Sequence, residues 1–461
     1  MTQAVTPARE ECLGYSAREE CPGYRTAMPW PVRLVLVYLA AITIFGKGPT
    51  YLGVPPLFWG EAVLAAALAW VAFAGRLPGF PLPKPKGLSA AICLFLALGA
   101  VLTGLYLPRW GLDAARDAAI WYYAAFAFVG LAIAAREALA ERVWTWLRVF
   151  WVLAMIWGVA DDLSGRQLSQ NGPLVPWRNV PVTWNSVSEM MQHMALGSLL
   201  VLATGLLRRR PVLRAVLSLV ALGGLMVAAK SASRGFKVGL ALGLVIVTVL
   251  SLAPGRPLRI HWRLFRWLAL AAILLVLAAV VLDLDLASMT NFSRFARDEG
   301  TSSWRLIWWE RLFEQVLSSN PAFGLGFGAN LDVFNPTITL NAFDPWPTRS
   351  PHNYNVTVFS RMGLAGLAVW LAILGLGIGG LFARTWRNRP HPAAESYTPE
   401  RREELAFWLL MLACSWGNGS FGVLMEGPAL GIWFWFALGF ATGRSLTPGP
   451  LAPWPSRPHT P

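Results

Sequence analysis

The sequence has little charge and few cysteines. Charged residues make up 14% of the 461 residues, whereas about 25% is usual in a soluble domain. The four cysteines have no companions at the spacing of zinc ligands, so neither a metal site nor a disulfide framework is predicted. No internal repeat of fixed period is found, and no basic stripe with interleaved aromatic residues indicates a groove for nucleic acid. These absences argue against a soluble, metal-binding or nucleic-acid-binding protein.

Long apolar runs are abundant instead. Hydrophobic residues make up 55% of the chain and the mean hydropathy is +0.48, and many of the runs could cross about 30 Å of hydrocarbon. The 24 tryptophans and 24 phenylalanines suit aromatic belts at two membrane interfaces. We therefore predict an all-α, polytopic integral membrane helix bundle over residues 31–443, with about twelve transmembrane helices. The runs are residues 32–46, 56–74, 88–107, 118–135, 144–160, 185–207, 212–229, 236–253, 267–283, 356–383, 405–422 and 428–443.

The positions of lysine and arginine predict the orientation. Short cytoplasmic loops are rich in these residues, and basic clusters such as 208–210 and 256–266 alternate with loops that are poorer in them. Residues 1–30 contain no apolar core of a signal peptide and are predicted to form a cytoplasmic tail. The proline-rich segment 444–461 is predicted to form a second one. The net charge of +14 is thus mainly a signal of topology, with both termini inside.

A short outward connection nevertheless carries two cations. Lys230 and Arg234 flank a Ser-Ala-Ser turn that precedes the eighth apolar run. A cation near the membrane is costly without a partner, and the start of a helix favours a bound anion. The alternative interpretation is that both side chains extend to the interface without a ligand.

The longest outward loop, residues 285–355, contains an amphipathic helix. Apolar residues recur three and four positions apart over 304–317, Ser303 is suited to cap the helix, and the Asn-Pro pair at 320–321 is suited to end it. Its three tryptophans predict that it lies along the outer interface. Arg305 falls in the predicted first turn, where a cation is unfavourable unless an anion binds beside it. A loop of this length is usually functional.

Two further motifs follow in the same loop. The glycine-rich stretch 324–328 resembles a phosphate loop superficially, but no strand precedes it and no Lys-Ser/Thr pair follows, so we predict a flexible turn. The loop ends in an isolated His352–Asn353 pair directly before an apolar run. The simplest alternative for His352 is a solvated histidine at the interface.

The sixth apolar run begins with a polar stripe. Asn185, Glu189 and His193 are spaced four residues apart, with Gln192 adjacent. Such groups usually face the bundle interior or a wet cavity, and hydrogen bonding between helices explains them as well as catalysis does. The neighbouring pair Asp161–Asp162 could contact a cation, although two carboxylates alone are weak support for a divalent ion.

The order and spacing of these motifs resemble the bacterial O-antigen ligase and polymerase superfamily. The resemblance covers Ala229 to Phe440, about half of the chain. Its motifs are Ser-Arg-Gly at 233–235, Ser-Trp-Arg-Leu-Ile-Trp-Trp at 303–309, Asn-Pro-Ala-Phe-Gly-Leu-Gly-Phe-Gly at 320–328, Pro-His-Asn at 351–353, Arg-Met-Gly-Leu-Ala-Gly at 361–366, Met-Glu-Gly-Pro at 425–428 and Trp-Phe-Trp at 433–435.

The resemblance implies an activity and a location. Superfamily enzymes take a glycan from an undecaprenyl pyrophosphate carrier on the periplasmic face of the bacterial inner membrane, and the ligases pass it to a sugar hydroxyl of the lipid A core without a metal. Their two loop arginines and their histidine match Arg234, Arg305 and His352. The resemblance thus agrees with the multi-pass membrane protein predicted from the apolar runs. We further predict that the protein uses no cofactor, contacts membrane lipids and is a monomer.

The chemistry of these residue types agrees with that activity. Arginine offers two parallel, permanently charged donors to a pyrophosphate and can stabilise charge that develops on the leaving group. A neutral histidine can act as general base toward a sugar hydroxyl, and a nearby arginine would lower its pKa. Direct attack would invert the anomeric centre. The predicted substrate contacts are Arg234, Arg305, Arg178, Asn353, Lys230, Glu189 and His193.

Two other functions remain open. An O-antigen polymerase or a protein O-oligosaccharyltransferase would use the same arginines and histidine with another acceptor. A translocase for lipid-linked glycans would need charges along a path through the bundle, whereas the candidate residues gather at the outer boundary.

Overall fold

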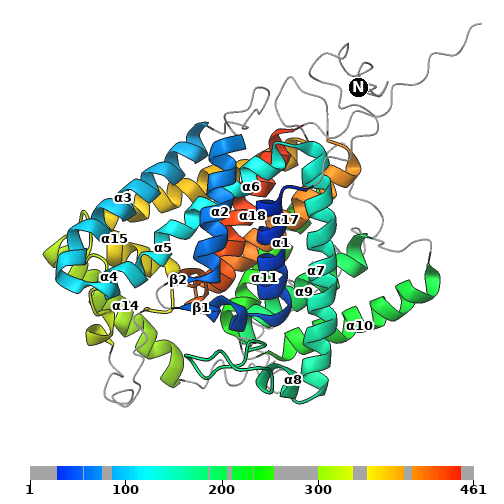
Figure 1. Cartoon of the computed structure of the whole chain (residues 1–461), viewed down its shortest axis with the longest axis horizontal. Coiled ribbons are helices and arrows are strands. Elements are labelled where there is room, and N and C mark those ends of the chain that lie inside the picture. Colours follow the sequence, from blue (N-terminus) through cyan, green and yellow to red (C-terminus); the bar gives the residue numbers. More distant parts are fainter. Residues whose placement is uncertain are drawn as a thin grey trace, which may run out of the picture.

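The computed structural model describes residues 28–54, 57–74, 86–184, 187–204, 210–231, 233–253, 299–335, 350–388 and 397–447. These segments form a helical bundle (Figure 1). In the described ranges, sheet is limited to an antiparallel pair, β1 (Gly53–Val54) and β2 (Leu57–Phe58), in which Gly53 is opposite Phe58. The all-α class predicted from the sequence therefore agrees with the fold.

The helices follow one another in a simple order. They are α1 (Trp30–Phe45), α2 (Trp59–Ala74), α3 (Lys86–Trp110), α4 (Leu112–Asp117), α5 (Ala119–Tyr122), α6 (Phe126–Ala134), α7 (Glu137–Leu163), α8 (Gln167–Gln170), α9 (Val187–Thr204), α10 (Pro211–Lys230), α11 (Arg234–Ser251), α14 (Glu299–Ser319), α15 (Tyr354–Leu374), α16 (Gly380–Arg387), α17 (Pro399–Gly419) and α18 (Pro428–Leu446).

Most of the predicted apolar runs coincide with these helices. Several predicted segments lie outside the described residues. They are the run 267–283, residues 285–298 and 336–349 of the long loop, and both predicted tails except for a few flanking residues. Five described segments are long and apolar enough to cross a membrane, and three shorter apolar helices accompany them. The five are Lys86–Trp110, Leu112–Ala134, Glu137–Leu163, Pro211–Lys230 and Tyr354–Arg387. A multi-pass membrane protein is thus supported, while the count of twelve helices stays a prediction.

The centre of the bundle is formed by α17 and α18. Nearly every described residue of both helices is buried, and they pack against α11 and α6, respectively. The 21 residues of α17 correspond to about 30 Å of helix, close to the hydrocarbon thickness of a bilayer. In Figure 1, α17 and α18 run between the upper and lower ends of the view, so their termini mark two ends of the molecule.

Glycines let these central helices approach closely. A Cβ atom on Gly239 of α11 would lie 2.3 Å from the carbonyl oxygen of Cys414, and one on Gly439 of α18 would lie 1.9 Å from that of Ala127. Neither position therefore tolerates a larger side chain without movement of the helices. Small residues at helix contacts are the usual way for apolar helices to gain packing in lipid.

An ion network ties the upper ends of α7, α17 and α18 together. Arg444 donates to Glu137 and Glu404 at 2.9 and 2.7 Å and also bonds Glu141, while Arg401 bonds Glu137 at 2.5 Å. Both arginine side chains are almost fully buried. The glutamates therefore neutralise both buried arginines.

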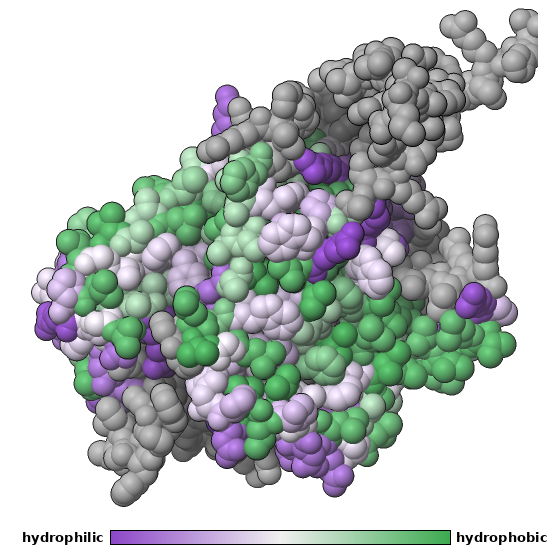
Figure 2. Space-filling view, in the orientation of Figure 1, coloured by the Kyte–Doolittle hydropathy of each residue, from purple (hydrophilic) through white to green (hydrophobic). Residues whose placement is uncertain are grey.

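The surface has the distribution expected of a membrane protein. Figure 2 shows hydrophobic residues gathered over α10 and the flank of α3, with hydrophilic residues toward the upper and lower ends of the view. Exposed large side chains on α10 include Val212, Leu219 and Met226, each more than 60% exposed. These faces are suited to contact lipid chains.

Candidate functional site

Helix α14 differs from its prediction in two ways. It begins at Glu299, so Ser303 does not cap it and Arg305 lies in its second turn; it ends at Ser319, as the Asn-Pro pair predicts. The prediction that Arg305 opposes the helix dipole from a first turn is therefore wrong. The start is not evident in the sequence because the residues before 304 carry no apolar period.

The tryptophans of α14 face the protein, so they do not themselves support the prediction that this helix lies along the membrane interface, which stays a prediction. Trp308 is fully buried and donates its ring N–H to the Leu331 carbonyl at 2.9 Å. Trp309 donates to the carbonyl of Pro351 at 2.6 Å. The Trp309 bond attaches α14 to the segment that carries the histidine, whereas the Trp308 bond attaches it to Leu331. Leu306 and Leu317 of the same helix are exposed.

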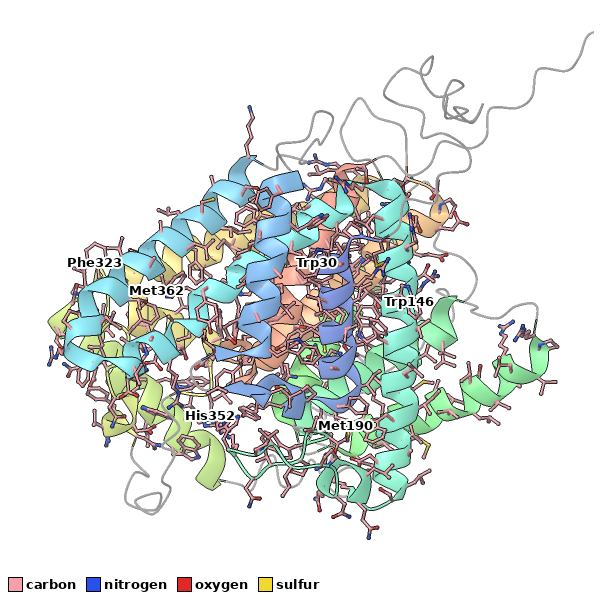
Figure 3. The ribbon with its side chains drawn as sticks, viewed as in Figure 1. Trp30, Trp146, Met190, Phe323, His352 and Met362 are labelled. Atoms are coloured by element: carbon pink, nitrogen blue, oxygen red, sulfur yellow. The ribbon has the colours of Figure 1, made fainter. Side chains whose placement is uncertain are left out.

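Arg305 and His352 meet around Trp304. The imidazole of His352 lies edge-on to the Trp304 ring, with 5.8 Å between centroids, and the guanidinium carbon of Arg305 lies 5.3 Å from the same ring. Figure 3 shows His352 at the lower end of the bundle. Partial burial, and then the charge of Arg305, lower the pKa of His352 to about 4. The histidine is therefore neutral at physiological pH and can accept a proton.

The His352 turn is bonded to the connection between α17 and α18. Ser350 donates its hydroxyl to Glu426 at 2.5 Å and accepts the backbone N–H of His352 at 3.2 Å. Thr357 donates to the same Glu426 oxygen at 2.7 Å. Burial raises the pKa of Glu426 to about 7.

Asn353 is the N-cap of α15. Its side-chain oxygen accepts the backbone N–H groups of Asn355 and Val356, at 2.9 and 3.3 Å. Asparagine is a preferred cap because its side chain satisfies donors that the first helical turn leaves unpaired. The side chain of Asn355 in turn donates to the Ser420 hydroxyl at 3.0 Å. The predicted substrate contact at Asn353 thus has a described structural role, namely to begin α15 directly after the histidine.

The backbone of Arg234 begins α11 beside the same connection. Ser233 caps this helix by accepting the N–H of Phe236 at 3.3 Å. A Cβ atom on Gly235 would lie 2.9 Å from atoms of both Asn418 and Phe421, and Arg305 donates to the carbonyl of Phe421 at 3.3 Å. The start of α11, the Arg305 side chain and the His352 turn therefore all contact residues 418–426.

The glycine-rich stretch is a tightly packed turn, which corrects the prediction of a flexible one. Gly324, Gly326 and Gly328 all have positive φ, between 73° and 86°, and a Cβ atom on any of them would clash with neighbouring atoms. Gly363, at φ 63°, interrupts α15 where this turn packs. The break deprives the Leu364 N–H of a partner within the helix, and this N–H donates instead to the carbonyl of Pro321 at 2.9 Å.

A buried ion pair anchors this glycine turn from the other side. Arg361 of α15 lies 2.7 Å from Asp117 and donates to the carbonyls of Gly326 and Ala329 at 3.1 and 2.6 Å. Asp117 also accepts the N–H of Gly328 at 3.0 Å. No pattern in the sequence indicates this pair, because the two side chains are far apart in the chain and Asp117 sits in a short polar segment.

The remaining predicted residues lie outside this cluster. His193 is buried in the core, where it accepts the ring N–H of Trp151 at 3.3 Å. Lys230 is exposed at the last residue of α10. Arg178 lies over the Tyr51 ring, 4.0 Å from its centroid.

Glu189 is buried on α9, and its Oε2 has no hydrogen-bond partner among the described residues. Its neighbour Gln192 bonds Ser415 and Asn418 of α17. That part of the polar stripe therefore joins helices, in agreement with the alternative of hydrogen bonding between helices.

Asp161 accepts the N–H of Ser169 at 2.8 Å, so one of its oxygens fixes the α7–α8 turn. In the part of the chain that the structure describes, no group of three or more His, Cys, Asp or Glu residues is arranged to hold a metal ion.

Part of the chain is similar to a known protein family. Residues 217–371 match the family model described as O-antigen ligase. The match shows what residues 217–371 of the chain are similar to, namely the O-antigen ligase family. The matched residues include most of α10, all of α11 and α14, and most of α15. Arg234, Arg305 and His352 also fall within the match. The search of curated proteins gave no match. This match supports a membrane enzyme of the glycosyltransferase type in general, in agreement with the resemblance described above.

Glu426 is the site residue that sequence reasoning misses. It belongs to the Met-Glu-Gly-Pro string of the resemblance, but no chemistry is assigned to it there. A single carboxylate between two long apolar runs is a usable signal, because an acid at a membrane boundary needs partners. Its partners, Ser350 and Thr357, cannot be predicted from spacing.

Proposed function

We propose that this protein is an O-antigen ligase. It transfers a glycan from an undecaprenyl pyrophosphate carrier to a sugar hydroxyl of the lipid A core, in lipopolysaccharide biosynthesis. The observation that carries the proposal is the meeting of Arg305 and His352 around Trp304, within the matched region. A permanent cation beside a neutral histidine is the pair that a pyrophosphate donor and a hydroxyl acceptor require.

The two arginines bind the pyrophosphate in this proposal. A guanidinium presents parallel donors that match phosphate oxygens, and its charge stabilises the leaving group as the anomeric bond breaks. Arg305 is fixed beside His352 by its bond to Phe421. The backbone of Arg234 starts α11 next to the same residue, so a donor held there could reach both arginines.

His352 acts as the general base. Its neutral imidazole takes the proton of the acceptor hydroxyl while that oxygen attacks the anomeric carbon. The bond from this carbon to the pyrophosphate oxygen breaks, and its electron pair leaves with the lipid pyrophosphate. The new glycosidic bond forms on the opposite face of the sugar, so the configuration inverts. Membrane lipids provide the surroundings in which the carrier is presented.

The other predicted contacts are assigned secondary roles. Asn353 orients the histidine by capping α15. Arg178, exposed on the Tyr51 ring, is proposed to contact the glycan, and Glu189, Lys230 and His193 are proposed to contact other parts of the substrate. No metal or cofactor enters the proposed reaction. Purified enzyme with excess chelator should keep its transfer activity, and loss restored by magnesium would assign a metal role to Asp161 and Asp162.

The site is proposed to face the periplasm of the bacterial inner membrane, with both termini cytoplasmic. Single cysteines introduced as Arg178→Cys and Asn388→Cys in a variant without the native cysteines test this topology. A membrane-impermeant thiol reagent should label intact cells at position 178 and leave position 388 unlabelled. The reverse pattern would invert the orientation.

The acceptor distinguishes the ligase from its relatives. Purified protein is incubated with undecaprenyl-pyrophosphate-linked glycan and, separately, with lipid A core, with a second lipid-linked glycan, or with a hydroxyl-bearing protein. Transfer to lipid A core is expected. Transfer only to the second glycan would indicate a polymerase, and transfer only to protein would indicate an O-oligosaccharyltransferase. Movement of the lipid-linked glycan across vesicles without any transfer would indicate a translocase.

A further inference from the structure

The carboxyl group of Glu426 joins the two flanks of the His352 turn. Ser350, two residues before the histidine, donates to Glu426 Oε1 at 2.5 Å, and Thr357, in the first turns of α15, donates to the same oxygen at 2.7 Å. Ser350 also accepts the backbone N–H of His352 at 3.2 Å. One carboxylate, carried by the α17–α18 connection, therefore bonds the chain on both sides of the proposed base.

The backbone of His352 is in a conformation that needs support. Its φ is 58°, in the left-handed region that residues other than glycine seldom adopt, and such conformations persist only where the surroundings fix them. The ring N–H of Trp309 bonds the Pro351 carbonyl on one side, and the Asn353 cap begins α15 on the other. Among the described bonds, the backbone N–H of His352 itself donates to the hydroxyl of Ser350.

We propose that Glu426 is a positioning residue, which acts through Ser350 and Thr357 to hold the left-handed turn that places the His352 imidazole against Trp304 and beside Arg305. The proposal rests on the function proposed above, because it concerns the same histidine. Glu426 is assigned no contact with substrate. Its role is to fix the backbone from which the base extends.

The charged groups around Glu426 set its ionisation. Arg361 and Tyr354 of α15 and Asp117 of α4 interact with it electrostatically, in addition to its hydroxyl partners. Burial raises its pKa to about 7. The ionised form accepts both hydroxyl bonds as charge-assisted bonds, which are about twice as strong as neutral ones. The turn should therefore loosen in part as the pH falls through about 7, well above the pH at which His352 is protonated.

Hydrogen exchange of the full-length protein in detergent tests the contact without any substrate. The peptide that covers residues 350–357 is followed in the wild type, Glu426→Ala, Ser350→Ala and Asp161→Asn. Asp161→Asn is the matched control, since its carboxyl bonds a backbone N–H at the same end and has no described contact with the His352 turn. Faster exchange of this peptide is expected in the first two variants and not in the control.

Transfer activity is then measured on the same preparations. Loss of hydrogen bonds worth about 1 kcal/mol each predicts a decrease of about 5- to 30-fold in kcat for Glu426→Ala. Ser350→Ala should give part of this loss, and the double variant should lose less than the product of the two effects, because both act on one chain of bonds. In Glu426→Gln the partial fall of activity near pH 7 should disappear, while the steep fall near the pKa of His352 should remain.

Several results would overturn the proposal. These are unchanged exchange of residues 350–357 in Glu426→Ala, wild-type kcat despite faster exchange, and strictly multiplicative effects in the double variant. Faster exchange along residues 399–419 as well would signal general unfolding, and Ser350→Ala and Glu426→Gln would then decide whether the proposal stands. If the wild type transfers no glycan, the proposed function fails, while the exchange result still decides whether Glu426 fixes the turn.

Discussion

The two ends of the bundle use charge in different ways. At the upper end of Figure 1, Arg444 and Arg401 are buried and bond three glutamates from α7 and α17. At the lower end, the described contacts around His352 are with hydroxyls, amides, carbonyls and indole rings, with Glu426 as the bonded carboxylate. The first arrangement balances charge within the protein, and the second orients a neutral base beside a cation.

This difference predicts which substitutions affect stability and which affect catalysis. Removal of one member of the upper network leaves a buried charge without its counter-ion, whereas removal of the imidazole leaves the bonds of the His352 backbone in place. Variants at the upper end should therefore lower the melting temperature with little effect on the activity of each folded molecule. Variants at the lower end should lower the activity of each folded molecule with little effect on the melting temperature.

The largest expected effect is that of His352→Ala on transfer. Loss of a general base typically lowers the rate about 10²- to 10⁴-fold, and the side chain is only partly buried, so the melting temperature should change little. The assay is glycan transfer by purified protein, with His391→Ala as a control at a predicted cytoplasmic loop. A melting temperature that falls as much as in variants of the Arg444 ion network would contradict the proposed difference between the two ends.

Arg444→Ala should have the largest effect on stability. Breaking a buried ion pair costs about 3–5 kcal/mol, and the lower limit applies here because Glu141 is 47% exposed and its bond is screened. Thermal unfolding in detergent measures the change. Transfer per folded molecule should stay close to the wild-type value. A strong loss of specific activity without loss of stability would mean that this end takes part in the reaction.

Arg305→Lys should weaken donor binding, because lysine keeps the charge and loses the planar pair of donors. The expected loss of affinity is about 10- to 100-fold, which corresponds to one hydrogen bond to a charged group. Arg305→Ala should be weaker still. The matched control is Arg311→Lys on the exposed side of the same helix. Binding of a labelled lipid pyrophosphate is the measurement, and equal affinity in Arg305→Lys and the wild type would contradict a bidentate contact.

The smallest effects concern pH. His352 has a pKa of about 4 in the folded protein and an ordinary value of 6.5, so its neutral form persists until the pH falls to about 4. Between these values the unfolded chain binds a proton that the folded one does not, and stability should decrease as the pH falls from 6.5 to 4. Arg305→Met should move the steep acid limb of the activity profile to higher pH, because the arginine charge contributes to the low pKa. An unmoved limb would contradict their proximity.

The sequence predicts the helices well, because long apolar runs report burial in lipid directly. It does not predict the break in α15, since Gly363 lies within a continuous apolar run and the turn that fills the break comes from residues 320–325. The inward direction of the α14 tryptophans is also not predicted from the sequence. Tryptophans suit both an interface and a core, and only the bonds to Leu331 and Pro351 decide between them.

The candidate site is predicted in part. Motif order selects Arg305 and His352, and the fold places them together. The roles of Glu426 and of the Asp117–Arg361 pair depend on contacts between distant segments, which a single sequence does not reveal. The sequence favours Asn353 as a substrate contact because it adjoins the histidine, whereas its position as a helix cap follows from the α15 start.

The central claim is that Arg305 holds the pyrophosphate and His352 activates the acceptor at one site. It is tested most directly by measuring donor binding and single-turnover transfer side by side in His352→Ala and Arg305→Ala. We expect His352→Ala to bind the lipid-linked glycan like the wild type and to transfer almost none of it, while Arg305→Ala loses binding itself. Transfer by His352→Ala at close to the wild-type rate would contradict the assignment of the base.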